Sequence, residues 1–293
     1  MTMDREAVFL ELKPMLFSLA YRMLGTRADA EDVVQETYLR WREAAEDEIR
    51  SPRAYLATVA ARLSLDSLKS AQRKREVYMG TWLPEPLVGP LGQQSVDMAE
   101  SLSLAFLHLL ESLSPPERVA FLLHEIFEMP YSELAAVLET SEANCRQLVT
   151  RAKKHIQQKK RRFTVDREHH RNVLEKFLHA CASGDPAQLA NLLHQDVVLY
   201  SDGGGKVRAA LNPIFGMDKV MRFFAGIVKK NALRGYSAEL AEVNGGPGAV
   251  FYKDGELAQV LDLEVDESGR IINIFLVSNP EKLPHEVGPK LQR

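Results

Sequence analysis

The spacing of the hydrophobic residues changes near residue 165, and this change limits the folds open to the chain. Before it, apolar residues recur at the three- and four-residue spacing of helices buried on one face. After it, the stretches 196–202, 248–265 and 271–278 carry β-branched and aromatic residues between glycine and aspartate turns. The sequence therefore predicts helical domains followed by an α+β domain whose curved sheet wraps a helix.

The length and composition indicate a globular protein of several domains. A chain of 293 residues is long for one core, and its 45% apolar and 26% charged residues are ordinary. No apolar run approaches the ~20 residues that cross a membrane, and the acidic N-terminus does not match a signal peptide. The two cysteines, Cys145 and Cys181, suit a reducing compartment. We expect a cytoplasmic protein without a membrane partner.

Charge is arranged in local blocks, although the net charge is only −3. Residues 29–48 hold eight acids against two arginines. Residues 50–75 hold seven basic residues against Asp66 alone, and residues 146–162 hold eight with no acid. The alternation of acidic and basic blocks predicts separate partners for the separate blocks.

The acidic block reads as a helix with one buried and one exposed face. Its buried stripe is Val33, Val34, Thr37, Tyr38 and Trp41. The opposite face carries Asp32, Gln35, Glu36 and Leu39. A leucine among acids is common on ordinary surfaces, but it is also typical of a docking helix.

A new helix is predicted from Ser51-Pro52, with proline in its first turn. Arg62, Lys69 and Arg73 share its outer face, which is either merely solvated or a nucleic-acid surface. Residues 79–94 then break the helical pattern with three prolines and three glycines and predict an extended linker. Trp82 and Leu83 are costly to leave in water, so the linker should pack against something.

A helix-turn-helix is predicted between residues 131 and 156. Its second helix should bury Cys145, Leu148, Val149, Ala152 and Ile156 and expose Asn144, Gln147, Thr150, Arg151 and Lys154. An ordinary helical hairpin and a DNA-reading helix both fit this pattern. The basic residues that follow, without any acid, favour DNA.

Two long stretches resemble a known family. "AYRMLGTRADAEDVVQETYLRWRE" resembles region 2 of extracytoplasmic-function (ECF) sigma factors, and "LSPPERVAFLLHEIFEMPYSELAAVLETSEANCRQLVTRAKKHI" resembles region 4. "WLPEP", "SDGGGK" and "SNPEKL" are similar to the SigJ-like subgroup, which appends a SnoaL-like domain. The implied fold is multidomain: two all-α sigma domains, region 2 a helical bundle and region 4 a helix-turn-helix, then an α+β SnoaL-like cone. The expected boundaries are residues 1–76 for region 2, 77–96 for the linker, 97–163 for region 4 and 164–293 for the cone.

The resemblance implies a transcription initiation factor that binds core RNA polymerase and promoter DNA, with no catalytic activity, cofactor or metal. The implied polymerase-binding residues are Asp32, Gln35, Glu36 and Leu39. The implied minus-ten contacts are Arg62, Lys69, Arg73 and Arg75, and the implied minus-thirty-five contacts are Asn144, Arg146, Gln147, Thr150 and Arg151. The family commonly has glycine where this chain has Glu139. We expect the turn to form with Glu139 in a slightly different geometry.

The contacts expected between the linker and the cone predict that the cone regulates initiation in cis. Trp82, Leu83 and Pro84 are expected to dock on the C-terminal domain, with Asp202, Gly203, Gly204 and Lys206 on the receiving side. The docked linker would set the relative placement of regions 2 and 4. Whether the SnoaL-like domain also binds an unidentified small ligand stays open.

Three other interpretations remain. A SnoaL-like isomerase or cyclase fused to a DNA-binding module would use Asp202, His194 or Lys206 in proton transfer. A repressor that acts without polymerase would need neither the acidic docking face nor a minus-ten helix. His169 and His170 suggest a metal, but no second ligand group lies at a suitable spacing in the sequence.

Overall fold

The chain divides into two units in the computed structural model, which describes residues 4–45, 49, 51–90, 102–159, 166–230 and 234–284. One unit combines Met1–Val77 with Leu109–Lys160, and the other combines Tyr78–His108 with Arg161–Arg293. Linker residues 78–90 and residues 102–108 therefore group with the C-terminal sheet, whereas the sequence assigned residues 97–108 to region 4. Within the described ranges, no helix combines the length and apolar character that spanning a bilayer requires.

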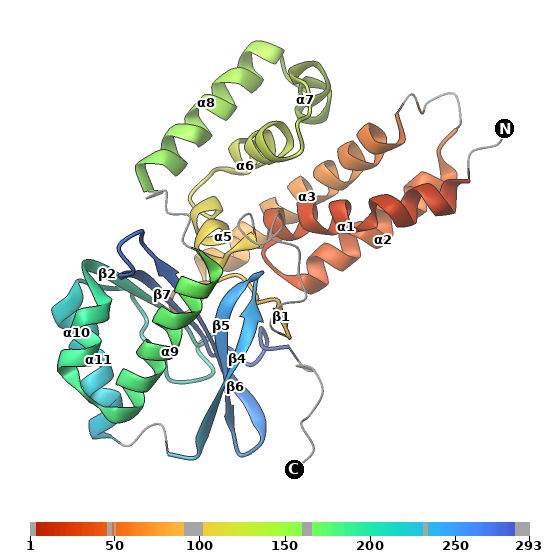
Figure 1. The fold of residues 1–293 in the computed structure, drawn as a ribbon. Coiled ribbons are helices and arrows are strands. Elements are labelled where there is room, and N and C mark those ends of the chain that lie inside the picture. Colours follow the sequence, from red (N-terminus) through yellow and green to blue (C-terminus); the bar gives the residue numbers. More distant parts are fainter. Residues whose placement is uncertain are drawn as a thin grey trace. The chain divides into compact units, whose positions relative to one another are not determined.

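The first unit begins with three helices, α1 (Arg5–Leu24), α2 (Arg27–Glu43) and α3 (Pro52–Glu76) (Figure 1). Asp4, Thr26 and Ser51 cap their N-termini, as short polar side chains do when they accept the first free N–H groups. Gly25 ends α1 in the left-handed conformation. The core of this bundle consists of buried side chains that include Leu16, Leu19, Tyr21, Trp41, Leu56 and Leu68.

The same unit contains α6 (Pro115–Phe121), a π-helical turn (Leu122–Ile126), α7 (Tyr131–Leu138) and α8 (Glu142–Lys159). At the start of α6, the Glu117 carboxylate accepts the Ser114 backbone N–H at 3.1 Å and its hydroxyl at 2.7 Å. All five apolar residues predicted for the inner face of α8 are buried: Cys145, Leu148, Val149, Ala152 and Ile156. The helix-turn-helix is confirmed.

Glu139, at the end of α7, corrects the expectation about the turn. Its φ and ψ of 50° and 47° place it fully in the left-handed region, where glycine would be unstrained. The turn is thus the one that a glycine would make, and the residue accepts a strain of about 1 kcal/mol.

The second unit is built on a seven-stranded sheet of order β1-β4-β5-β6-β7-β2-β3. The strands are β1 (Val88–Gly89), β2 (Leu193–Asp202), β3 (Ile214–Phe215), β4 (Tyr236–Val243), β5 (Gly246–Lys253), β6 (Glu256–Val265) and β7 (Ile271–Val277). Only β2 and β7 pair in parallel among these strands, which leaves an antiparallel meander from β4 to β7. The α+β fold class is confirmed.

Three helices cover one side of this sheet: α9 (Arg167–Ser183), α10 (Pro186–Leu192) and α11 (Met217–Lys229) (Figure 1). Phe177 of α9 and Phe224 of α11 meet edge-on at 5.4 Å within a core of aliphatic strand residues. The predicted hairpin at Asp254-Gly255 is present, with positive φ at both residues, as a two-residue turn of type I′ requires.

Helix α5 (Leu104–Leu110) begins in the second unit. Its first backbone N–H, that of Leu104, donates to the buried carboxylate of Asp262 on β6. Burial, reinforced by the nearby charge of Glu264, raises the pKa of Asp262 to about 8. Farther along the helix, the His108 ring lies 4.5 Å from the ring of Tyr200 on β2. The first residues of the predicted region 4 are therefore attached to the C-terminal sheet.

Candidate polymerase, promoter and linker sites

The acidic face of α2 is exposed to solvent. Asp32, Gln35 and Leu39 are exposed, and Glu36 is partly exposed and pairs with Arg40 at 2.9 Å. On the other face, Val33, Val34, Thr37 and Trp41 are buried. Because the apolar stripe fixes the rotation of the helix, the acidic face is presented outward.

The cations predicted for minus-ten DNA have different surroundings. Lys69 is exposed and lies 3.3 Å from Asp66. Arg62 donates to two backbone carbonyls at the end of α7, those of Ala136 and Val137.

Arg75 is mostly buried and pairs with Glu111. It also donates to the carbonyl of Leu24, and burial lowers its pKa below the ordinary arginine value. In this conformation Arg75 does not face outward, because its donors are already used inside the unit, and its contact with minus-ten DNA stays a prediction. Arg73 lies within α3, but its side chain is outside the described part of the structure.

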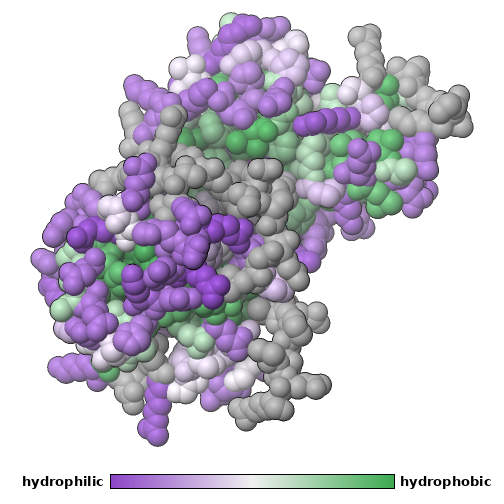
Figure 2. Space-filling model, in the orientation of Figure 1, coloured by the Kyte–Doolittle hydropathy of each residue, from purple (hydrophilic) through white to green (hydrophobic). Residues whose placement is uncertain are grey.

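The outer face of α8 presents every residue predicted for the minus-thirty-five element. Arg146, Gln147, Thr150 and Arg151 are exposed, and Asn144 is partly exposed. In the upper part of Figure 2, hydrophilic residues cover the outward surface around α7 and α8, with apolar residues beneath them. The helix thus has the two faces that reading a major groove from a packed helix-turn-helix requires.

Three cations of this face are paired with carboxylates. Arg146 pairs with Glu142 at 2.7 Å, Lys153 with Glu125 at 2.6 Å, and the Arg151 Nε lies 3.5 Å from Glu117. The cations of these pairs are exposed to solvent, so each pair contributes little to stability. They do restrict where the cations point in the absence of DNA.

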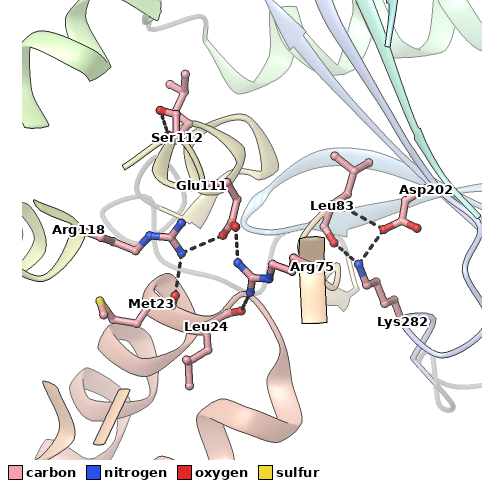
Figure 3. Close-up of polar contacts among 10 residues, drawn as sticks. Met23, Leu24, Arg75, Leu83, Glu111, Ser112, Arg118, Asp202 and Lys282 are labelled. Atoms are coloured by element: carbon pink, nitrogen blue, oxygen red, sulfur yellow. Dashed lines mark hydrogen bonds and ion pairs between the residues drawn. The ribbon is translucent and has the colours of Figure 1, made fainter. Parts of the chain in front are cut away.

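The linker site on the C-terminal domain is centred on the Asp202 carboxylate at the end of β2. This carboxylate accepts the Leu83 N–H at 2.9 Å, the Tyr78 hydroxyl at 2.6 Å and the Gly204 N–H at 3.0 Å. The Lys282 ammonium lies 2.7 Å from it and donates to the Leu83 carbonyl at 2.6 Å (Figure 3). Leu83 and Asp202 are fully buried. The Asp202 hydrogen bond raises the pKa of Tyr78, an effect second to that of burial.

Aromatic rings complete the linker site. The Lys282 ammonium lies 4.1 Å from the centre of the Trp82 ring and 4.8 Å from that of Tyr78, within the range of cation–π attraction. Pro84 is buried, and Trp82 is half-buried. Trp82 and Leu83, the linker residues that are costly to leave in water, therefore pack on the C-terminal domain.

Two parts of the predicted receiving surface are placed differently. Lys206 pairs with Glu281, and the cation at the linker is Lys282. The tight approaches are to Val207 and Ala209 at Gly203 and to Asn279 at Gly204, rather than to Trp82 or Leu83. A long lysine side chain can reach several carboxylates, so the sequence alone does not select between the two lysines.

Sequence reasoning also missed Asn244, which holds the linker farther along. The Asn244 N–H donates to the Leu87 carbonyl at 2.8 Å, and the Leu87 N–H donates to the Asn244 side-chain oxygen at 3.0 Å. The amide nitrogen of that side chain donates to the Leu102 carbonyl at 2.9 Å. Beside it, the linker forms β1 by pairing Val88 with Val243. The Asn-Gly dipeptide at residues 244–245 signals a hairpin, but no local pattern indicates the long-range partner.

A helical bundle with an exposed acidic helix, followed by a helix-turn-helix with an exposed basic face, defines a transcription initiation factor of the sigma-70 class. Comparison with known families agrees: sigma-70 region 2 matches residues 8–74, and sigma-70 region 4 matches residues 103–156.

Similarity to individual proteins extends over nearly the whole chain. It is 40% identical to the ECF RNA polymerase sigma factor SigJ of Mycobacterium tuberculosis, over 94% of this chain and 91% of SigJ. The crystal structure of SigJ superposes with a TM-score of 0.77, covering 93% of this chain and 95% of that one. Identity to the probable ECF sigma factor SigI of the same species is 33%, over 92% of this chain and 91% of SigI. The chain therefore belongs to the ECF RNA polymerase sigma factors, and the family prediction is confirmed.

Proposed function

We propose that three surfaces of this sigma factor each bind a different partner. The Asp32, Gln35, Glu36 and Leu39 face of α2 docks on the clamp helices of core polymerase, and α3 holds the minus-ten element through Arg62, Lys69 and Arg73. Asn144, Arg146, Gln147, Thr150 and Arg151 read the minus-thirty-five element. The observation that carries this proposal is the exposed polar face of α8 opposite a fully buried stripe. Polymerase binding places this activity in the cytoplasm.

Base contacts and phosphate contacts on α8 should respond differently to mutation. Asn144→Ala, Gln147→Ala or Arg151→Ala is expected to relax base preference and to cost about 1–3 kcal/mol where a bidentate contact is lost. Lys153→Ala is expected to weaken binding evenly across sequences and to flatten its salt dependence. Binding of the variants to a panel of minus-thirty-five duplexes at several salt concentrations measures both effects. Equal losses on every duplex for both sets would rule out direct base reading by α8. Lys159→Ala and Lys160→Ala are expected to act like Lys153→Ala, although those side chains lie outside the described residues.

We also propose that the C-terminal domain regulates initiation in cis and is not a catalyst. The linker that joins regions 2 and 4 is bound to this domain at Asp202 and Asn244, so the domain can influence how the two regions are placed. Against catalysis stands the state of Asp202, whose oxygens are buried and already hydrogen-bonded to the linker, Gly204 and Lys282. An unidentified small ligand of the domain would act by changing linker docking.

Removing the residues after 160 should change promoter output, and Trp82→Ala should reproduce part of that change. The reason is that Trp82→Ala removes the ring over Lys282 and the apolar area that the linker buries. Transcription from one promoter with purified core polymerase is the measurement, and Trp82→Phe, which keeps an aromatic ring, is the matched control. Equal initiation by truncated and full-length protein would overturn regulation in cis. Catalytic turnover by the full-length protein that is lost in Asp202→Asn would instead support the isomerase or cyclase interpretation.

A further inference from the structure

The carboxylate of Glu117 is fixed at the start of α6. Its Oε2 accepts the Ser114 backbone N–H at 3.1 Å and the Ser114 hydroxyl at 2.7 Å, so it closes a capping box. Burial would raise the pKa of Glu117, but these hydrogen bonds and the charges of His155 and Arg151 outweigh burial and hold the pKa below its ordinary value. Only 9% of the side chain is exposed. Glu117 is therefore a charged group whose position is set by its own helix end.

The second oxygen of this carboxylate faces the predicted reading helix. Glu117 Oε1 lies 3.5 Å from the Arg151 Nε of α8. His155, one turn farther along α8, also acts on the carboxylate by its charge. Nε is the guanidinium nitrogen nearest the backbone, whereas end-on recognition of a guanine uses the two Nη groups. An arginine attracted at Nε therefore keeps the donors of its far end for DNA.

The Glu117 pair differs from the other two ion pairs on the outer face of α8. Glu142 and Arg146 lie one turn apart on α8 itself, and their side chains are 45% and 55% exposed. Glu125 reaches Lys153 from the π-helical turn, with 24% of its side chain exposed. Glu117 is the least exposed of the three carboxylates and is held by two hydrogen bonds from the start of α6. Among these three pairs, Glu117 therefore gives its cation the most rigid partner.

We propose that Glu117 is a positioning residue that directs Arg151 toward the base edges of the minus-thirty-five element. The inference rests on the proposed base-reading role of α8. Immobilising a long side chain at an interface costs conformational entropy. An arginine that Glu117 already restricts loses less of this entropy when it meets the matching base pair.

The same carboxylate disfavours contacts that carry no sequence information. A guanidinium that turns freely can bind a phosphate on any sequence. Glu117 opposes such contacts, because it neutralises part of the charge of Arg151 and repels phosphate. It therefore lowers affinity for arbitrary DNA more than affinity for the matching element, and this difference in affinity is specificity.

The test compares Glu117→Gln with the unmodified full-length chain, after Arg151→Ala has identified the base pair that Arg151 reads. Glutamine also closes a capping box, so the start of α6 should be kept while the charge beside Arg151 is lost. Affinity for an unrelated duplex should rise about threefold, with a steeper salt dependence. The ratio of affinities for the matching duplex and for a duplex changed at that base pair should fall about fivefold. Fluorescence anisotropy of labelled duplexes at several salt concentrations measures both quantities.

Glu125→Gln is the matched control, because it removes the same charge from another carboxylate that reaches α8 from a neighbouring element. The cation that it frees, Lys153, is a predicted phosphate contact, so affinity should rise evenly for all duplexes and the ratio should stay unchanged. Glu117→Asp is a second variant that keeps the charge but draws the carboxylate back by one methylene. The ratio should fall in Glu117→Asp even if Glu117→Gln fails to fold.

Combining Glu117→Gln with Arg151→Ala separates positioning from packing. If Glu117 acts through Arg151, the double variant has the same ratio as Arg151→Ala. A further fall in the double variant would show that Glu117 acts through the packing of α6 and would overturn the inference. An unchanged ratio in folded Glu117→Gln and Glu117→Asp would overturn it as well. If Arg151→Ala discriminates as well as the unmodified chain, base reading by Arg151 is refuted, and the inference that rests on it fails for that separate reason.

Discussion

Asp202→Ala is expected to detach the linker from the C-terminal domain and to lower the free energy of unfolding of the second unit by about 3–5 kcal/mol. The loss is large because Lys282, whose side chain is only 8% exposed, would keep its charge without a carboxylate. Tyr78 and the Leu83 N–H would lose their acceptor at the same time. Removing one partner of a buried ion pair costs far more than removing an exposed pair.

Trp82 fluorescence reports both the detachment of the linker and the unfolding of the second unit. It is measured in a Trp41→Phe background, because Trp41 and Trp82 are the two tryptophans of the chain. Denaturant titration of the full-length variant gives the change in unfolding free energy. Lys206→Ala is the matched control. Lys206 lies shortly after Asp202 in the chain, and the substitution breaks only its exposed pair with Glu281, so it should cost less than about 1 kcal/mol. A loss for Asp202→Ala no larger than for Lys206→Ala would show that the linker is held by its apolar contacts alone.

The elements that could be predicted from the sequence are those fixed by neighbours along the chain. The buried stripe of α8 follows from helical spacing, and the start of α3 at Ser51-Pro52 follows from capping. The hairpin at Asp254-Gly255 needs only the preference of those two residues for positive φ. The change from helices to a sheet-containing domain near residue 165 also follows from the local spacing of hydrophobic residues.

The features that escaped prediction depend on partners distant in the chain. Nothing near residue 88 indicates that the linker adds a strand beside β4, and nothing near Asp202 selects Lys282 over Lys206. The arginines of α3 show the same limit. Spacing gives the face from which a side chain starts, but a long guanidinium can reach DNA, a helix end or Glu111, and only the packing decides.

The packing also gives a physical reason for a residue other than glycine at a left-handed backbone position. Glu139 occupies a position that favours glycine, and the strain of its left-handed backbone is unfavourable in isolation. In the folded unit its carboxylate lies 3.8 Å from Arg62, which also caps α7. A negative side chain at the turn therefore helps to place the cation that satisfies the helix end.

Asp32→Arg combined with Glu36→Arg is expected to reduce affinity for core polymerase at least 100-fold while leaving the fold intact. Both side chains lie on the outward face of α2, and neither belongs to the buried stripe of Val33, Val34 and Trp41, so folding should not depend on them. At an interface that pairs this acidic face with cations, like charges placed opposite one another cost several kcal/mol, which is the size of a 100-fold loss.

The control for this prediction carries the same change of charge at another surface. Glu11→Arg with Glu267→Arg alters the net charge equally, and both positions are exposed and lie outside α2. Competition of each double variant with a labelled wild-type chain for core polymerase measures affinity, and circular dichroism checks the fold. If the Asp32 and Glu36 variant competes as well as the control, α2 does not dock through this face. The exposed Leu39 beside these acids would then be ordinary surface, because no polymerase contact would remain to account for its 43% exposure.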